Sequence, residues 1–388
     1  MIRPRTFHNL DLDRVHIGVP AHEAVVLEAK ARNASCVVVV MPQIIIDNTP
    51  IVAPIIEALG DKCAGTFTEL IDHVPRSAVL ALADYLRKTE ADLVITIGGG
   101  TPMDTVKVAL ICLAEDITTG DALGRAAVSV DADGNRVVPN IANPPLRQVI
   151  IPTTLSGAEF SDLAGCVDTE TQVKQLFSSP QIGSASVILD PALCVHTPDP
   201  LWFSTGIRAI DHAVETICSS APEPMADAGA LHALRLFSSS LQLNKSEPDN
   251  LEARLDSQTA VWMACTGLNR TPYGASHGIG HQLGAVANVP HGYTSCVMLP
   301  HVMAFNADAT KERQTWISDA LGTPKTSASV TVAKLVATLG MPTTLRDVGV
   351  KPDHFDAIAD GAMLNAFVRA NIKPIERSDI IGLLEQAY

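Results

Sequence analysis

Residues 92–110, DLVITIGGGTPMDTVKVAL, follow the order strand, glycine turn, helix, and this order decides the fold of the first half of the chain. An apolar, β-branched run of this length is typical of a strand buried on both faces. Three consecutive glycines let the backbone turn sharply and approach a ligand closely. We expect Thr101 to cap the following helix, Pro102 to take its first position and Asp104 to be its capping-box acid. The free N–H groups of such a helix start can bind a pyrophosphate; alternatively, the glycines only join strand to helix.

Similar apolar runs recur before residue 188 and stop after about residue 190, where helical periodicity takes over. The runs are VVVV at 37–40, RQVIIPTT at 147–154 and SVILD at 186–190. We therefore predict an α/β domain with a parallel sheet over residues 1–188 and an all-helical domain over residues 189–388. The turn-rich stretch DPALCVHTPDPLWF at 190–203 is the predicted hinge. The polar turn at 152–159 also follows a strand, so both turns are expected at the ligand-binding edge of the sheet.

The composition argues against two classes of binding partner, nucleic acid and anionic lipid. The formal net charge of −14 leaves no basic patch for nucleic acid or anionic lipid, so we expect neither partner. The N-terminal segment lacks the apolar core of a signal peptide, and no run of about 18 apolar residues could span a bilayer. We therefore expect a cytoplasmic protein. Its eight cysteines are scattered singly, which favours buried thiols over a disulfide framework.

The stretch SHGIGHQLGAVANVPHG, residues 276–292, contains three histidines. His277 and His281 are four residues apart and would share one face of a helix. Such spacing is typical of metal sites, although a histidine-rich core held by backbone hydrogen bonds is the alternative.

Four segments together carry a resemblance to a known family. GGGTPMD (98–104), PTTLSGAE (152–159), GIRAIDHAVE (206–215) and SHGIGHQLGAVANVPHG (276–292) resemble the iron-containing (group III) alcohol dehydrogenase family. PTTLSGAE looks most like the maleylacetate reductase branch, whereas GGGTPMD keeps the alcohol dehydrogenase form and HGIGHQLG departs from that branch.

The resemblance implies an architecture and a cofactor. The expected fold is a Rossmann-like dinucleotide-binding domain followed by an all-helical domain, as in dehydroquinate synthases. The family transfers hydride between NAD(H) or NADP(H) and an alcohol or carbonyl carbon, and its members are often homodimers. The residues expected to hold the cofactor are Gly98, Gly99, Gly100, Thr101 and Asp104 on the pyrophosphate side and Thr153 and Thr154 on the nicotinamide side.

The resemblance also places His212, His277 and His291 on the ligand positions of an iron or zinc ion, and His281 on the histidine that faces the nicotinamide. Arg208 stands where the metal enzymes have a ligand aspartate, and a guanidinium has no lone pair to give. Held about 4 Å from a divalent ion, it would cost roughly 8 kcal/mol at an effective dielectric near 20.

A bound metal ion is nevertheless compatible with the sequence. Three imidazoles alone can hold zinc. Arg208 could swing away or form a salt bridge elsewhere, and Asp211 could reach in although it projects about 100° around the helix from His212.

These residues favour a reductase of an oxo acid. A protonated His281 or His277 would hydrogen-bond the oxygen on which negative charge develops and deliver a proton to it, while Arg208 holds a substrate carboxylate through paired N–H donors. The alternatives are a metal-dependent dehydrogenase of small alcohols, a lyase related to dehydroquinate synthase, and a dinucleotide-binding protein without catalysis. No acid follows the strand that ends at Val40, so NAD and NADP both stay open.

Overall fold

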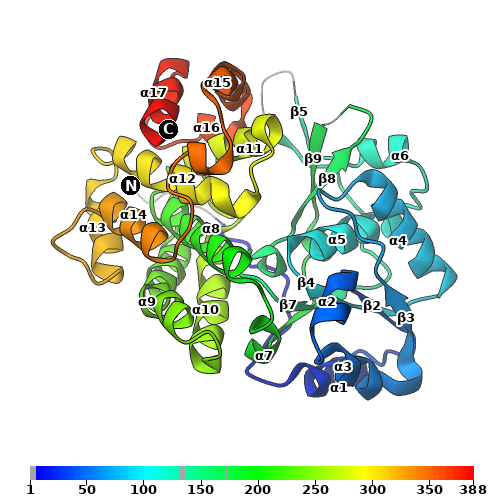
Figure 1. Cartoon of the computed structure of the whole chain (residues 1–388). Helices are drawn as coiled ribbons and strands as arrows, with labels where there is room; N and C mark the ends of the chain where they lie inside the picture. Colours follow the sequence, from blue (N-terminus) through cyan, green and yellow to red (C-terminus); the bar gives the residue numbers. More distant parts are fainter. Residues whose placement is uncertain (1–5, 132–135, 172) are drawn as a thin grey trace. The chain divides into compact units, whose positions relative to one another are not determined.

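The computed structural model describes residues 6–131, 136–171 and 173–388, and the chain folds as two compact units (Figure 1). Unit 1 holds the chain up to Thr153 together with Gly157–His196, and unit 2 holds Thr154–Ser156 and Thr197–Tyr388. The units therefore divide at 196/197 rather than at the expected 188/189. The predicted fold class, a parallel-sheet unit followed by an all-helical unit, is confirmed.

Unit 1 is built on a six-stranded sheet whose neighbouring strands all run parallel. In spatial order the strands are β1 (Arg14–Ile17), β10 (Ser186–Leu189), β7 (Gln148–Pro152), β4 (Leu93–Gly98), β2 (Val37–Val40) and β3 (Cys63–Phe67). Two antiparallel hairpins accompany it: β5 (Ser129–Val130) with β6 (Arg136–Val137), and β8 (Leu163–Asp168) with β9 (Val173–Ser178).

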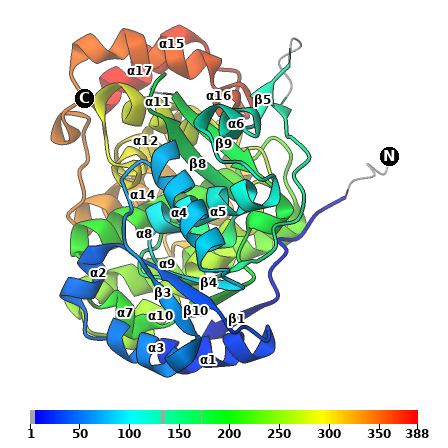
Figure 2. The same ribbon diagram turned by 90° about the vertical axis from the view of Figure 1, so that its right-hand side faces the viewer.

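Successive side chains of each strand point to opposite sides of the sheet. Both sides are apolar here, and helices cover both of them. Val37 and Val39 pack in one apolar cluster with α1 (Ala21–Ala31) and α3 (Val52–Leu59). Val38 and Val40 pack in another with α4 (Arg76–Lys88) and α5 (Gly100–Ala114), on the opposite side of the sheet (Figure 2). The remaining helices of the unit are α2 (Gln43–Asn48), α6 (Gly120–Arg125) and α7 (Pro191–Cys194).

The four inner strands were predicted from the sequence, whereas β1 and β3 were not. These two are the edge strands: no residue of RVHI is fully buried, and in CAGTF only Phe67 is. An edge strand is half solvated, so it lacks the continuous apolar run that marked the inner strands.

The helix start at the glycine turn differs from the expectation. Helix α5 begins at Gly100 with Gly99 as its N-cap, and no side chain caps it, so Thr101 lies inside the first turn and its predicted capping role was wrong. Asp104 is not a capping-box acid either, because its carboxylate accepts the backbone N–H of Gly165 at 3.0 Å. We attribute this difference at the start of α5 to the sharp turn at Gly98, whose φ of 142° favours glycine. A Cβ at position 98 would also come within 2.7 Å of Pro102 Cγ.

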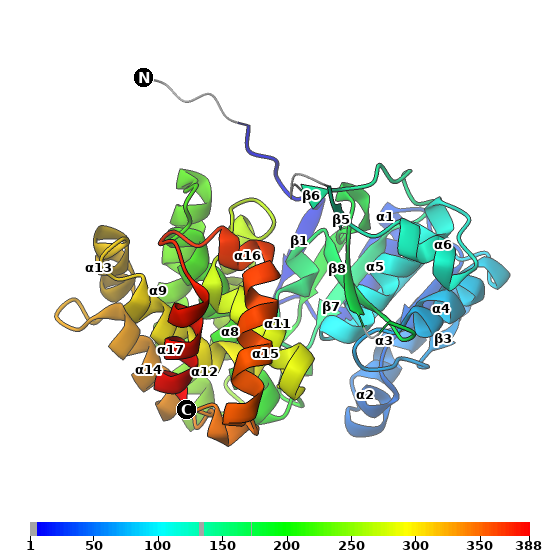
Figure 3. The same ribbon diagram turned by 90° about the horizontal axis from the view of Figure 1, so that it is seen from above.

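Unit 2 contains helices and no strand, and all of its residues are described. Among the residues that the structure describes, no helix is both long and apolar enough to cross a membrane. Helices α11, α12, α15 and α17 lie side by side (Figure 3). The helices are α8 (Asp199–Ile217), α9 (Pro224–Ser246), α10 (Leu251–Ala264), α11 (Ala275–Ala287), α12 (His291–Phe305), α13 (Lys311–Ala320), α14 (Ala328–Thr338), α15 (Phe355–Leu364), α16 (Ala366–Arg369) and α17 (Arg377–Ala387).

Helix α8 is the centre of unit 2. It packs against α9, α10 and α12, and every residue from Trp202 to Ile217 is buried. A helix buried all round is normally apolar. The charged side chains on α8 are therefore the feature of unit 2 that needs an explanation.

In unit 1, a buried carboxylate ties the edge strand β1 to the sheet. Glu28 on α1 is fully buried, with its oxygens 2.7 Å from His16 Nε2, 2.8 Å from Ser186 Oγ and 3.1 Å from Arg32 Nε. Burial alone would raise the pKa of Glu28, but these hydrogen bonds and the charges of Arg32 and Arg14 bring it below its ordinary value. The ionised carboxylate thus stabilises the fold.

We predict that Glu28→Gln lowers the free energy of unfolding by about 2 kcal/mol at neutral pH, because it removes charge-assisted hydrogen bonds. The pKa of Glu28 is lower in the folded state, so its contribution is present above the unfolded pKa and is lost as the pH falls through the folded pKa. Urea unfolding should show the difference from wild type shrinking on acidification. Glu23→Gln, on the exposed face of the same helix, is the control and should change stability by less than about 0.5 kcal/mol.

Candidate active site

Four polar side chains lie on consecutive turns of the buried helix α8: Arg208, Asp211, His212 and Glu215. Their spacing of three, four and seven residues puts Arg208, Asp211 and Glu215 along one face. The side chain of Asp211 is fully buried, and those of Arg208 and Glu215 are nearly so. Buried charges are stable only when they are paired, so their partners determine how the neighbouring helices pack.

Glu215 connects α8 to the start of α11. Its Oε2 accepts the backbone N–H of Gly274 at 3.1 Å, and its Oε1 accepts that of Ser276 at 3.0 Å. A carboxylate at this position satisfies N–H groups that have no partner inside the helix, and it complements the positive end of the helix dipole. The first turn of α11, and with it His277, is therefore held against α8.

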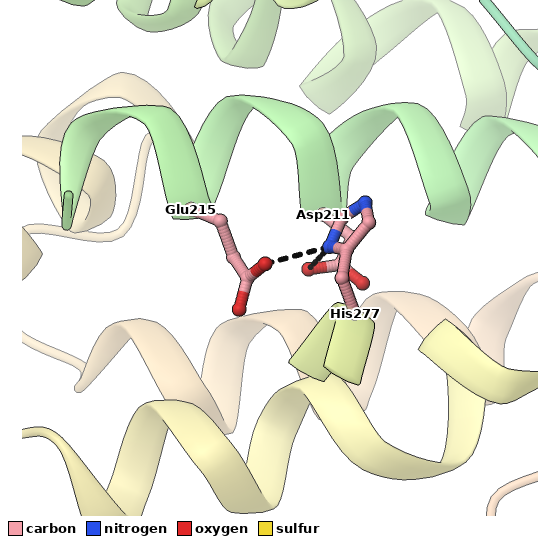
Figure 4. A group of neighbouring side chains, drawn as sticks. All are labelled: Asp211, Glu215 and His277. Atoms are coloured by element: carbon pink, nitrogen blue, oxygen red, sulfur yellow. Dashed lines mark ion pairs between the residues drawn. The ribbon is translucent and has the colours of Figure 1, made fainter. Parts of the chain in front are cut away.

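His277 lies between two carboxylates (Figure 4). Its Nδ1 is 2.6 Å from Glu215 Oε2 and 3.6 Å from Asp211 Oδ1. Burial and the charge of Arg208 lower the pKa of His277, but Asp211 and Glu215 outweigh them, so the pKa lies above its ordinary value. The pKa of Asp211 is held well below its usual range, because His277, Arg208 and Ser295 together overcome the effect of burial. When His277 is protonated, the cluster brings it and Arg208 together with the two carboxyl groups of Asp211 and Glu215.

The other ring nitrogen of His277 meets His212. His277 Nε2 lies 3.0 Å from His212 Nδ1. Burial, together with the charges of His277 and Arg208, puts the pKa of His212 well below its ordinary value, so His212 is neutral. When His277 is protonated it donates from Nε2, so His212 then accepts at Nδ1 and carries its own proton on Nε2. Both nitrogens of His277 are therefore engaged within the cluster.

Arg208 does not swing away from the cluster. Its Nη1 donates to Ser295 Oγ at 3.0 Å and lies 3.6 Å from Asp211 Oδ2. That oxygen of Asp211 also accepts from the hydroxyls of Ser276 at 2.8 Å and Ser295 at 2.6 Å. The buried Nε of Arg208 has no hydrogen-bond partner in the part of the chain that the structure describes. One donor of the guanidinium is thus unused.

The remaining two histidines form a second group. The rings of His281 on α11 and His291 on α12 stack with centroids 5.9 Å apart and 13° between their planes. Phe367 lies 5.4 Å from His281, and Asn365 Nδ2 is 3.3 Å from His281 Nδ1. The structure thus brings His212 to His277 and His281 to His291, and the three-histidine ligand set of His212, His277 and His291 stays a prediction.

Among the described residues, the group that could hold a metal ion is Asp211, Glu215 and His277, whose ligand atoms lie within 4.8 Å of one another. His277 was expected in a ligand set from the sequence, whereas no role was predicted for Glu215. The signal was present, because Glu215 stands four residues after Asp211 and seven after Arg208 on one predicted helix.

In unit 1 the two loops expected to hold a dinucleotide lie together. Gly98 pairs with Pro152 across β4 and β7, and Thr153 N–H donates to Gly98 C=O at 2.9 Å. The uncapped start of α5 therefore lies beside Thr153 at the carboxyl ends of two parallel strands, as the sequence led us to expect. Thr154 belongs to unit 2, where its hydroxyl donates to Ser156 Oγ at 3.1 Å.

Comparison with known proteins gives a consistent result along the chain. Residues 13–191 match the family described as iron-containing alcohol dehydrogenase, and residues 202–388 match the C-terminal region of the Fe-containing alcohol dehydrogenase family. Dehydrogenase FUM7 of Gibberella moniliformis is 31% identical over 96% of this chain and 95% of its own length. Maleylacetate reductase of Sphingobium indicum is 28% identical over 85% and 83%. The crystal structure of a 1,3-propanediol oxidoreductase superposes with a TM-score of 0.88 at 25% identity, over 99% of this chain and 100% of the other.

The pairing of His277 with Glu215 predicts a pH-dependent stability. The folded pKa of His277 is raised, so its contribution is complete below the unfolded pKa and is lost as the pH rises through the folded pKa. Each unit of raised pKa is worth about 1.4 kcal/mol. In Glu215→Gln the pKa of His277 should fall, and urea unfolding should show a weaker loss of stability from about pH 6.5 upward.

The matched control is Glu252→Gln on the exposed side of α10, which should retain the wild-type dependence on pH. If Glu215→Gln and wild type lost stability in parallel as the pH rises, Glu215 would not be the group that keeps His277 charged.

Proposed function

Because the chain belongs to the iron-containing alcohol dehydrogenase family, we propose that it is a nicotinamide-dependent reductase of oxo acids that works without a resident metal. The chain is an oxidoreductase acting on CH–OH or carbonyl groups. Its oxo acid substrate is inferred from Arg208. Maleylacetate reductase of Sphingobium indicum, a relative whose name includes an oxo acid, supports this choice.

NAD(H) or NADP(H) would supply the hydride, which no side chain can carry. In unit 1, the backbone N–H groups at the uncapped start of α5, around Gly100 and Thr101, suit the pyrophosphate. Thr153 and Thr154 are the proposed contacts on the nicotinamide side. The strand β2 is followed by Met41, Pro42 and Gln43 without an acid for a ribose hydroxyl, so activity should be assayed with both dinucleotides.

The residues at the family's metal position do not fit a divalent cation. His277 Nδ1 is ion-paired with Glu215, and Asp211 Oδ2 already accepts from two serine hydroxyls. An ion bound there would have to displace the proton of His277. It would also lie near the guanidinium of Arg208, 3.6 Å from Asp211, which repels it. A protonated His277 together with Arg208 would already balance the two carboxylates without an additional cation.

The observation that carries the oxo acid proposal is the unused donor of Arg208. Its Nη1 is fixed by Ser295 and Asp211, while its buried Nε has no partner among the residues described. A buried donor without an acceptor costs about 1 to 3 kcal/mol, which a substrate carboxylate would recover. Guanidinium and carboxylate also match in geometry when two parallel N–H groups are used.

His281 is the better candidate for the hydrogen-bond donor to the substrate oxygen. Both ring nitrogens of His277 are engaged, by Glu215 and by His212, so His277 serves to position its neighbours. His281 lies one turn further along α11 and is only half-buried. A donor aimed at the oxygen stabilises the negative charge that develops as hydride reaches the carbon.

A second candidate is a metal-dependent dehydrogenase of small alcohols, which would use iron or zinc. The observation in its favour is the proximity of Asp211, Glu215 and His277, two carboxylates and one imidazole whose ligand atoms lie within 4.8 Å of one another. The structural likeness to a 1,3-propanediol oxidoreductase is consistent with it.

We also propose, on the family resemblance alone, that the protein is a cytoplasmic homodimer that takes a small-molecule carbonyl substrate. Analytical ultracentrifugation at micromolar concentration would test the dimer.

Replacing Arg208 should affect oxo acids selectively. We predict that Arg208→Lys, which keeps the charge but loses the paired donors, raises KM for an oxo acid by about 10- to 100-fold. KM for a neutral ketone of the same chain length should change by less than about 3-fold. Steady-state kinetics with both substrates gives the comparison, and Arg235→Lys on the exposed face of α9 is the control. Equal changes for acid and ketone would refute a carboxylate contact at Arg208.

Chelation distinguishes the two candidate functions. We expect protein dialysed against EDTA to contain well under one equivalent of iron or zinc per chain by elemental analysis, and to keep its activity with an oxo acid. Activity that disappears with EDTA and returns with one equivalent of iron or zinc would instead establish the metal-dependent dehydrogenase.

A further inference from the structure

Asn365 connects two structural roles in unit 2. It joins α15 to α16, and as the N-cap of α16 its Oδ1 accepts the backbone N–H of Phe367 at 2.9 Å. Its amide nitrogen Nδ2 lies 3.3 Å from Nδ1 of His281 on α11. The side chain of Asn365 therefore contacts both α16 and α11.

The cap decides which way the amide faces. Only the carbonyl oxygen of an asparagine can accept a hydrogen bond from a backbone N–H, because the amide NH2 is a donor. With Oδ1 committed to Phe367, the NH2 group must face His281. A flipped amide would set two donors against each other at Phe367 and leave a helix N–H unsatisfied. The assignment of the amide thus follows from the structure around it.

A close approach of two helices puts Asn365 within reach. Gly278 lies on α11 one turn before His281, and a Cβ built there would come within 2.9 Å of the backbone nitrogen of Val368 on α16. Any side chain at position 278 would therefore push α16 away from α11. The absence of one lets the start of α16 lie against the turn that carries His281.

We propose that Asn365 is a positioning residue that fixes the neutral form of His281 with its proton on Nε2. The donor Nδ2 of Asn365 requires a lone pair on Nδ1 of His281, so the single proton of the neutral ring occupies the other nitrogen. Stacking on His291, 5.9 Å away, and contact with Phe367, at 5.4 Å, restrain the ring plane. Asn365 thereby makes Nε2 the nitrogen from which the neutral ring of His281 can donate, and the proposed function requires such a donor.

This inference rests on the proposed role of His281 and makes it more specific. A neutral imidazole with Nε2–H polarises a carbonyl by hydrogen bonding, without first acquiring a second proton. An imidazolium would place Nδ1–H against the NH2 group of Asn365, two donors facing each other. In its neutral form His281 therefore donates from Nε2, and the proton that completes the alcohol comes from water.

The test replaces the amide donor at position 365 by an acceptor and keeps the N-cap of α16. Aspartate is as good an N-cap as asparagine, so Asn365→Asp retains the contact with Phe367 but offers an acceptor to His281 Nδ1. The proton of the neutral ring should then move to Nδ1. Asn365→Ser also caps the helix, but its short side chain does not reach His281. Asn250→Asp, the same exchange at the N-cap of α10, is the control and should change neither the ring nor turnover.

The direct readout is 15N NMR of histidine-labelled full-length protein, with the signals of His281 identified by their loss in His281→Gln. We expect wild type to show a protonated Nε2 and an unprotonated Nδ1, and Asn365→Asp to show the reverse at a pH where the ring is neutral. At that pH kcat should fall by about 10- to 100-fold in Asn365→Asp, with NADH affinity by fluorescence unchanged.

The outcomes separate the two claims. A wild-type ring protonated on Nδ1, or an Asn365→Asp ring identical to wild type, would overturn the inference about Asn365. A tautomer that switches as expected while kcat stays at the wild-type level would uphold that inference and remove His281 from the proposed function.

Discussion

The pairing of charges inside helix α8 is the constraint on which the rest of unit 2 depends. Arg208, Asp211 and Glu215 cannot be buried singly, since removing one partner of a buried pair typically costs about 3 to 5 kcal/mol. Their partners come from elsewhere: His277 and the N-terminal N–H groups of α11, and Ser295 from α12. The positions of α11 and α12 against α8 therefore follow from electrostatics as much as from apolar packing.

Arg208 shows how a local conflict in the sequence is resolved in three dimensions. Placed at a ligand position, its charge conflicts with a metal ion. In the structure it lies 3.6 Å from Asp211, three residues further along the same helix, and that acid in turn faces His277 rather than His212. In this arrangement the guanidinium lies near a carboxylate, and that carboxylate lies near an imidazole.

Most of the fold could be predicted from the sequence, and so could part of the polar cluster on α8 and α11. The inner strands were predictable because Val37–Val40 and Leu93–Gly98 are continuously apolar, whereas the edge strand β1 is not. The histidines were found through motif positions. Asn365 was missed because 84 residues separate it from His281, and their contact depends on how α16 lies against α11, which no local pattern encodes. The start of α5 was misplaced because the turn at Gly98 is tighter than the capping residues suggested.

The division of the chain into two units also divides the proposed contacts. Arg208, Asp211, Glu215, His277, Asn365 and the serines that support them all belong to unit 2, while the glycine turn and Thr153 belong to unit 1. Changes confined to residues 197–388 could therefore alter the proposed substrate contacts while the proposed dinucleotide contacts in unit 1 stay as they are.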